Sequence, residues 1–171
     1  MKNIMLLSFP RSGNTLMRTV LESAFDIKTY GYNHPIDLSP VLFQENGFID
    51  YRNDVLIIKR HDTYKAENFQ GLIFILRNKT EAIESHIEKE LKNHHNMNIE
   101  LKRAEYSDEY ERLIDFYNTF RGAKILIHYD KLIKGEIRLN EIATLFGLGS
   151  TKEIDFNKTK EVARNIYKKV I

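Results

Sequence analysis

The chain of 171 residues contains no cysteine and no tryptophan, and its net charge is only +2. Without cysteine there are no disulfides and no thiolate chemistry, which suits a reducing compartment. No apolar run is long enough to cross a bilayer, and no cleavable leader precedes the first predicted strand. The small net charge requires neither a nucleic-acid nor a membrane partner. We therefore expect a cytoplasmic protein in which any positively charged site is local.

Hydrophobic residues make up 42% of the chain and charged residues 29%, enough to fill one compact core. We expect a single domain over residues 1–171. Apolar runs predict buried strands at residues 4–7, 54–59, 71–76 and 124–128, and the second of these runs is rich in β-branched residues. Such continuous runs favour parallel strands covered on both faces. Between and after them, segments of helical period predict helices. The expected fold class is therefore α/β, with three layers and a central, mostly parallel sheet of four to five strands flanked by helices, as in P-loop NTPases.

The first predicted strand is followed by Ser-Phe-Pro-Arg-Ser-Gly-Asn-Thr at residues 8–15, and then by a predicted helix over residues 16–25. The first N–H groups of a helix lack intrahelical partners, and the helix dipole is positive there. A strand, a small polar turn and a helix N-terminus together predict an anion site, with a phosphate-bearing ligand. An ordinary strand-to-helix turn without a ligand stays open as the alternative.

Five residues of this turn are candidate ligand contacts. Arg11 supplies a permanent charge whose fork geometry suits an oxyanion. Ser12 is the predicted N-cap, and Gly13 lets the backbone adopt positive φ close to a ligand. Asn14 and Thr15 add polar side chains beside the free N–H groups. The nucleoside-triphosphate motif G-x-x-x-x-G-K-[ST] is absent, because Asn14 stands where its lysine would be.

Further polar residues follow the other predicted strands. In open α/β sheets ligands bind beyond the carboxyl ends of the strands, so Lys59 and His61 should lie on the same rim as Arg11. Arg77 follows the third strand, and Ser85 lies two helical turns further on, where the two could converge on one phosphate. Solvated surface residues are the alternative for all four positions.

Residues 8–15 resemble the 5′-phosphosulfate loop of sulfotransferases, which use 3′-phosphoadenosine 5′-phosphosulfate (PAPS). Lys59-Arg60-His61 resembles the family's Lys-Thr-His, in which the lysine contacts the transferring group and the histidine is the catalytic base. Arg77 and Ser85 keep the spacing of the family's 3′-phosphate segment. Tyr129, in Tyr-Asp-Lys-Leu, resembles the family tyrosine that lies near the nucleotide.

This resemblance, from about Asn3 to Gly147, implies transfer of a sulfuryl group from PAPS to a hydroxyl or amine acceptor by in-line displacement. It implies that His61 is the general base, that Lys59 and Arg11 neutralise developing charge, and that no metal is required. The Pro-Arg-Ser-Gly-Asn form of the loop suggests a carbohydrate acceptor. A non-catalytic module that binds 3′-phosphoadenosine nucleotides, or a P-loop kinase with an eroded motif, are the alternatives.

The chain departs from the family pattern at two functional places. Leu16 stands where cytosolic members carry a tryptophan against adenine, and no Arg-Lys-Gly clamp for the 3′-phosphate occurs near the C-terminus. The basic residues of the predicted C-terminal helix are expected to be mostly solvated: Lys158, Lys160, Arg164, Lys168 and Lys169.

Three segments carry weaker signals. Residues 27–54 predict loops and a short helix that could cover a pocket. The charged residues 88–105, with adjacent His94 and His95, predict a mobile loop beside the acceptor site rather than a metal site. An aromatic stripe from Tyr106 to Phe120 predicts an amphipathic helix facing the core.

Overall fold

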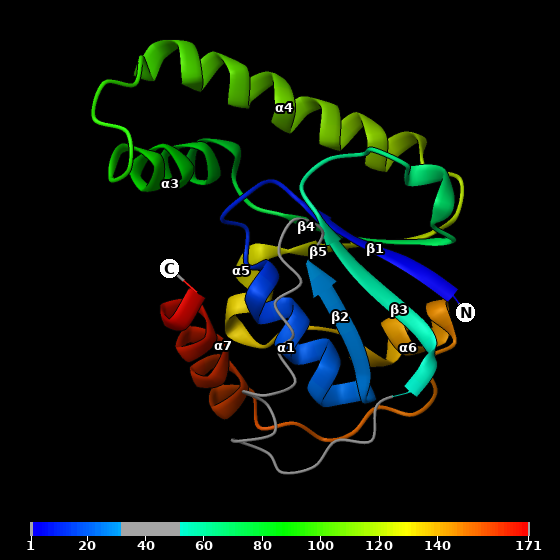
Figure 1. Cartoon of the computed structure of the whole chain (residues 1–171). Helices are drawn as coiled ribbons and strands as arrows, with labels where there is room; N and C mark the ends of the chain where they lie inside the picture. Colours follow the sequence, from blue (N-terminus) through cyan, green and yellow to red (C-terminus); the bar gives the residue numbers. More distant parts are fainter. Residues whose placement is uncertain (1, 32–51, 171) are drawn as a thin grey trace.

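A five-stranded sheet forms the centre of the molecule in the computed structural model, which describes residues 2–31 and 52–170. Every strand pairs in parallel, in the order β2-β3-β1-β4-β5 (Figure 1). The strands are β1 (Lys2–Ser8), β2 (Ile27–Gly31), β3 (Arg52–Arg60), β4 (Gly71–Leu76) and β5 (Ala123–His128). Four of them confirm the predicted strands. Strand β2 corrects the prediction of loops and a short helix at the start of residues 27–54; residues 32–51 of that prediction lie outside the described residues.

Helices cover both faces of the sheet (Figure 1). On one face lie α1 (Asn14–Phe25), α5 (Tyr129–Lys134), α6 (Leu139–Phe146) and α7 (Phe156–Val170); on the other lie α3 (Lys79–Leu91) and α4 (Ile99–Thr119). A short 3₁₀ turn spans Ala66–Asn68. Alternate residues of β1 serve the two layers, because Ile4 and Leu6 pack into the core with α1 while Met5 and Leu7 pack against α3 and α4. The three-layer α/β prediction is confirmed.

Strand register sets the positions of the residues that follow the strands. Leu7 of β1 pairs with Arg60 of β3, so the residues after this pair, Ser8 and His61, come side by side. Leu76 of β4 pairs with His128 of β5, which brings Arg77 next to Tyr129. Parallel strands end at one edge, and that edge collects these side chains.

The connection between α3 and α4 is shorter than the sequence suggested. The predicted mobile loop over residues 88–105 is wrong, because α3 continues to Leu91 and α4 begins at Ile99. Charged residues there belong to two amphipathic helices, whose apolar sides carry Ile87, Tyr106 and Tyr110 into the core. The predicted amphipathic helix from Tyr106 to Phe120, with its aromatic stripe facing the core, is confirmed by α4.

Polar residues of α1 are buried instead of forming a solvated stripe. Arg18 donates from Nε to the Thr29 hydroxyl at 2.7 Å and from Nη2 to the Thr29 carbonyl at 2.8 Å. Glu22 accepts the Thr29 backbone N–H at 3.0 Å. This network ties α1 to β2, and a buried charge needs such partners. Within the described ranges, no helix is both long and apolar enough to cross a membrane.

Candidate active site

The turn between β1 and α1 has two residues in the left-handed region. Arg11 has φ 67° and Gly13 has φ 86°. Gly13, rather than the predicted Ser12, is the N-cap of α1, and no side chain caps that end. A Cβ on Gly13 would lie 3.1 Å from side-chain atoms of Leu132 and Tyr129, so this tight contact and the positive φ both favour glycine here. The first N–H groups of α1 therefore face the site without a side-chain cap.

Neighbouring strands hold this turn in place. Asn14 donates from Nδ2 to the Ser8 hydroxyl at 2.7 Å, and Arg77 donates from Nη1 to the Arg11 carbonyl at 2.8 Å. The buried Ser12 hydroxyl and Asn14 Oδ1 have no hydrogen-bond partner in the described part of the chain. Buried polar atoms are normally satisfied, so these two fit a turn built to receive a polar ligand.

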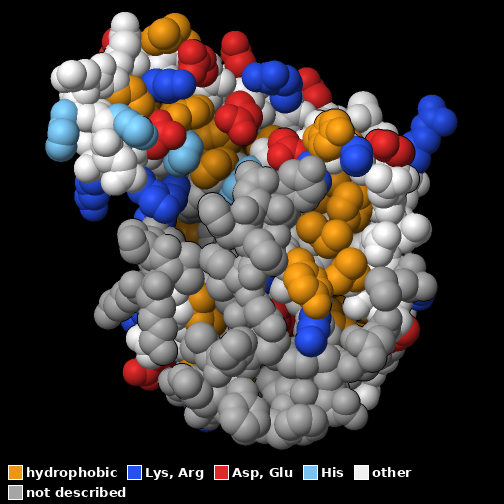
Figure 2. Space-filling view, viewed as in Figure 1, with side chains coloured by type: hydrophobic (Ala, Val, Ile, Leu, Met, Phe, Trp, Pro, Cys, Tyr) orange, Lys and Arg blue, Asp and Glu red, His pale blue; other side chains and the backbone are white. Residues whose placement is uncertain are grey.

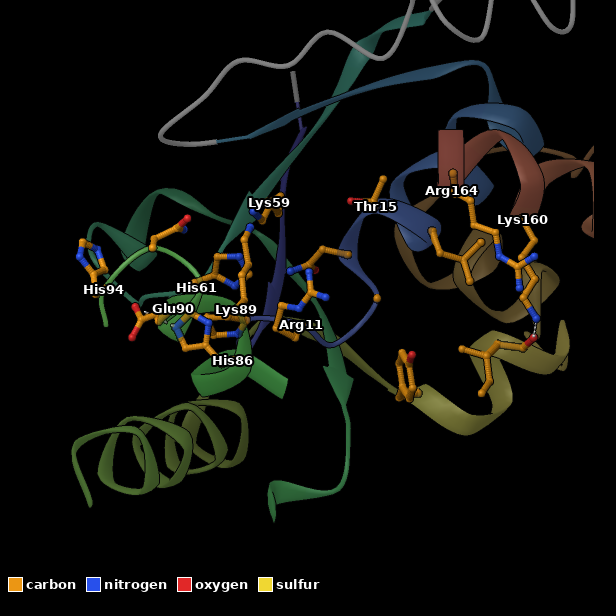
Figure 3. Close-up of a pocket in the computed structure, with 18 residues that line it drawn as sticks. Arg11, Thr15, Lys59, His61, His86, Lys89, Glu90, His94, Lys160 and Arg164 are labelled. Carbon is orange, nitrogen blue, oxygen red and sulfur yellow. Dashed lines mark hydrogen bonds and ion pairs between the residues drawn. The ribbon is translucent and has the colours of Figure 1, made fainter. Parts of the chain in front are cut away.

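A cavity of about 750 Å³ opens along this edge of the sheet (Figure 3). Most of the predicted site residues line it: Arg11, Gly13, Asn14, Thr15, Lys59, His61 and Tyr129. The fold thus brings together predicted residues from three separate segments, more than 100 positions apart in some pairs. Ser12 is buried behind the turn, at 1% exposure.

Arg77 and Ser85 do not reach the cavity wall in this structure. The Arg77 guanidinium lies behind the turn, with its carbon 4.7 Å from the centre of the Tyr129 ring and its Nε 3.6 Å from Glu81. Ser85 is half-buried on α3. Their convergence on one phosphate stays a prediction.

His61 has a defined tautomer. Its Nδ1 lies 2.8 Å from the Ser8 carbonyl, which can only accept, so Nδ1 carries the proton. Nε2 then keeps its lone pair in the neutral ring. Burial, assisted by the charge of Lys59, lowers the pKa of His61 to about 4. The imidazole is neutral at pH 7 and able to accept a proton at Nε2.

The side chains of Lys59 and Arg11 lie beside His61 in the cavity (Figure 3). Burial lowers the pKa of Lys59 to about 8, with further contributions from Arg18 and Lys89. Burial, and then the charge of Arg77, lowers the pKa of Arg11. Desolvated cations that repel one another gain stability when an anion binds between them.

Sequence reasoning named Leu16 and placed residues 88–105 beside the acceptor site, but it did not identify the other side chains at the two ends of the cavity. On one side α3 and the residues after it contribute polar side chains: His86, Lys89, Glu90, Asn93 and His94. On the other side, Leu16, Ile133 and Ala163 form an apolar corner next to Lys160 and Arg164. The expectation that the basic residues of the last helix are solvated is wrong for Lys160, which is half-buried and donates to the Ile133 carbonyl at 2.8 Å.

The spacing of these residues held a usable signal. Lys89 and Glu90 follow His86 by three and four residues, which places all three on one face of α3. Lys160 and Arg164 are four apart on α7. Helix α7 packs against α1 (Figure 1), and Lys160 and Arg164 line the cavity as a result of this packing.

The described residues that line the cavity carry five cationic side chains and one carboxylate, Glu90. Figure 2 shows histidine, basic and acidic side chains gathered at the α3 end of the molecule. Among the described residues, no group of three or more histidine, aspartate or glutamate side chains is arranged to hold a metal ion. The cavity as a whole suits a multiply charged anion.

No family model and no curated protein matches the chain. Among solved structures, it is similar to the mouse sulfotransferase SULT7A1 complexed with PAP, with 16% identity and a TM-score of 0.56. The alignment covers 96% of this chain and 63% of the mouse chain. The protein therefore has the α/β fold of a sulfotransferase, in a chain that spans less than two thirds of the length of that neighbour.

Proposed function

We propose that the protein is a cytoplasmic PAPS-dependent sulfotransferase that transfers the sulfuryl group to a hydroxyl or amine, with a carbohydrate as the favoured acceptor class. The observation that carries this proposal is the meeting of Arg11, Lys59 and His61 beside the uncapped N-terminus of α1. PAPS carries about four negative charges near neutral pH, and a cavity with five cations and one carboxylate offsets them. The fold shared with a PAP-bound sulfotransferase also supports this ligand.

The reaction follows from the tautomer of His61. As the acceptor oxygen attacks sulfur, His61 Nε2 takes the hydroxyl proton. A new S–O bond forms, the bond between sulfur and the 5′-phosphate oxygen breaks, and that oxygen leaves with the electron pair on 3′-phosphoadenosine 5′-phosphate (PAP). Lys59 and Arg11 neutralise charge on the transferred group and on the leaving oxygen. The proton balance closes when imidazolium returns its proton to water. No step requires a metal.

The nucleotide would occupy the side of the cavity formed by α1, α5 and α7. The amides of residues 12–15 would bind the 5′-phosphate. Tyr129 with the apolar corner at Leu16 would accommodate the base, and Lys160 and Arg164 would supply charge at the end where the sequence lacks the family clamp. We retain Arg77 and Ser85 as proposed contacts of the 3′-phosphate.

Two measurements test the proposal together. Titration calorimetry with PAP measures nucleotide binding, and transfer of ³⁵S from labelled PAPS to a panel of acceptors measures activity. We expect both. Binding without transfer would favour the nucleotide-binding module, which the 63% coverage of the neighbour makes a specific alternative. Magnesium-dependent ATP binding without PAP binding would favour the kinase.

A further inference from the structure

The α3 end of the cavity differs in chemistry from the α7 end. Figure 3 shows His86, Lys89, Glu90 and His94 on the same side of Arg11 as His61, with Lys160 and Arg164 on the other side. The α3 wall is polar throughout, whereas the α1, α5 and α7 wall contains the apolar corner. A base fits the apolar corner, so the α3 end is left for the acceptor.

One neighbouring side chain hydrogen-bonds to Glu90, and a second lies close to it. The Tyr106 hydroxyl donates to Glu90 Oε2, and Nε2 of His86 lies 3.7 Å from Glu90 Oε1. Burial raises the pKa of Tyr106, so that its hydroxyl remains a donor at neutral pH. Burial lowers the pKa of His86, which favours a neutral ring beside the carboxylate. The Glu90 side chain is 30% exposed and lines the cavity, so a partner in the cavity can reach its carboxylate.

A carboxylate can only accept hydrogen bonds, and it repels anions. Glu90 therefore repels the phosphate and sulfate groups of the nucleotide. Its natural partner is a hydroxyl or an ammonium group. Because Glu90 shares its end of the cavity with His61, that partner belongs to the molecule whose attacking hydroxyl lies at His61.

We propose that Glu90 binds a second hydrogen-bond donor of the acceptor, and that the acceptor is a polyhydroxylated or amino-hydroxylated molecule such as a saccharide. This inference rests on the proposed sulfuryl transfer. It assigns Glu90 to acceptor recognition and Tyr106 to positioning Glu90. A planar phenol or simple alcohol lacks the second donor and cannot use this contact.

The test compares two acceptor sets in the ³⁵S assay. One set contains methyl glycosides and glucosamine; the other contains 4-nitrophenol, 2-naphthol and cyclohexanol. We expect the wild-type protein to favour the first set at least tenfold in kcat/KM. In Glu90→Gln we expect the acceptor KM to rise about tenfold, as the loss of one charged hydrogen bond predicts, while the Kd for PAP changes less than twofold.

Two further variants separate recognition from structure. Tyr106→Phe should raise the acceptor KM in the same direction with PAP binding kept, because the carboxylate loses its fixed orientation. Asp108→Asn, which removes an exposed carboxylate of α4 outside the cavity, should change neither constant. Thermal melting of each variant reports whether it folds.

Each outcome decides the inference. A preference for phenols, an unchanged acceptor KM in Glu90→Gln, or PAP binding without transfer to any saccharide would overturn it while leaving the nucleotide site intact. Absence of both PAP binding and transfer in the wild-type protein would instead remove the proposed function itself.

Discussion

Nucleotide binding should take up protons at Lys59. With its pKa lowered to about 8, half of the free protein carries a neutral Lys59 at pH 8, and about one tenth does at pH 7. A bound phosphate stabilises the charged amine and raises its pKa again. We therefore expect PAP binding to take up about 0.5 proton at pH 8 and about 0.1 at pH 7, and the Kd to weaken roughly tenfold between pH 7 and pH 9.

Calorimetry in two buffers of different ionisation enthalpy measures this uptake directly. Lys59→Arg keeps the positive charge but does not titrate in this range, so it should bind PAP with a Kd that no longer depends on pH above 8. Lys59→Gln should bind more weakly and also show no uptake. The phosphates of PAP titrate near pH 6 and contribute equally to all three proteins. Equal proton uptake at pH 8 in the wild-type protein and in Lys59→Gln would refute the reasoning.

Three further outcomes follow from the site. His61→Ala should lower turnover by about two to four orders of magnitude with PAP binding largely kept, whereas His95→Ala, outside the cavity, should leave turnover unchanged in the same assay. Gly13→Ala should cost roughly 1–2 kcal/mol of stability in urea denaturation and also weaken PAP binding, while Gly149→Ala, at φ 84° outside the cavity, should lose stability alone. The pKa of His61 is lower in the folded protein than in the unfolded chain, so the unfolded chain takes up a proton at His61 first as the pH falls. The free energy of unfolding should therefore drop by about 3 kcal/mol between pH 6.5 and pH 4. The His61→Gln variant should show a smaller drop.

Four strands of the sheet could be predicted from the sequence because they are buried on both faces. A strand such as Gly71–Leu76 is covered by two layers of helices and so shows an uninterrupted apolar run bounded by polar residues. Strand β2 was not readable: Thr29 and the polar residues of α1 satisfy one another across the interface. Charged residues in such a buried network have the same sequence pattern as exposed residues, because their partners lie elsewhere in the chain.

The helix residues at the ends of the cavity were harder to predict than the strand-end residues, for a related reason. Glu90 and Arg164 lie on helices whose other faces are apolar, and a charged helix face normally points to solvent. Whether it instead lines a cavity depends on how α3 and α7 pack against the sheet, which a local pattern does not encode. The strand-end residues were easier, because parallel topology alone places Lys59, His61 and Arg77 at one edge.

Arg77, which follows β4, holds the turn between β1 and α1 in its observed conformation. Its guanidinium donates to the Arg11 carbonyl and stacks on Tyr129, and the Arg77 carbonyl accepts a hydrogen bond from the Tyr110 hydroxyl. These contacts offset the cost of about 1–2 kcal/mol that a left-handed residue such as Arg11 carries. The turn is therefore formed before any ligand arrives, and the energy of nucleotide binding need not be spent on ordering it. Because Arg77 is hydrogen-bonded to this turn, the proposed contact of its guanidinium with the 3′-phosphate would depend on the same turn.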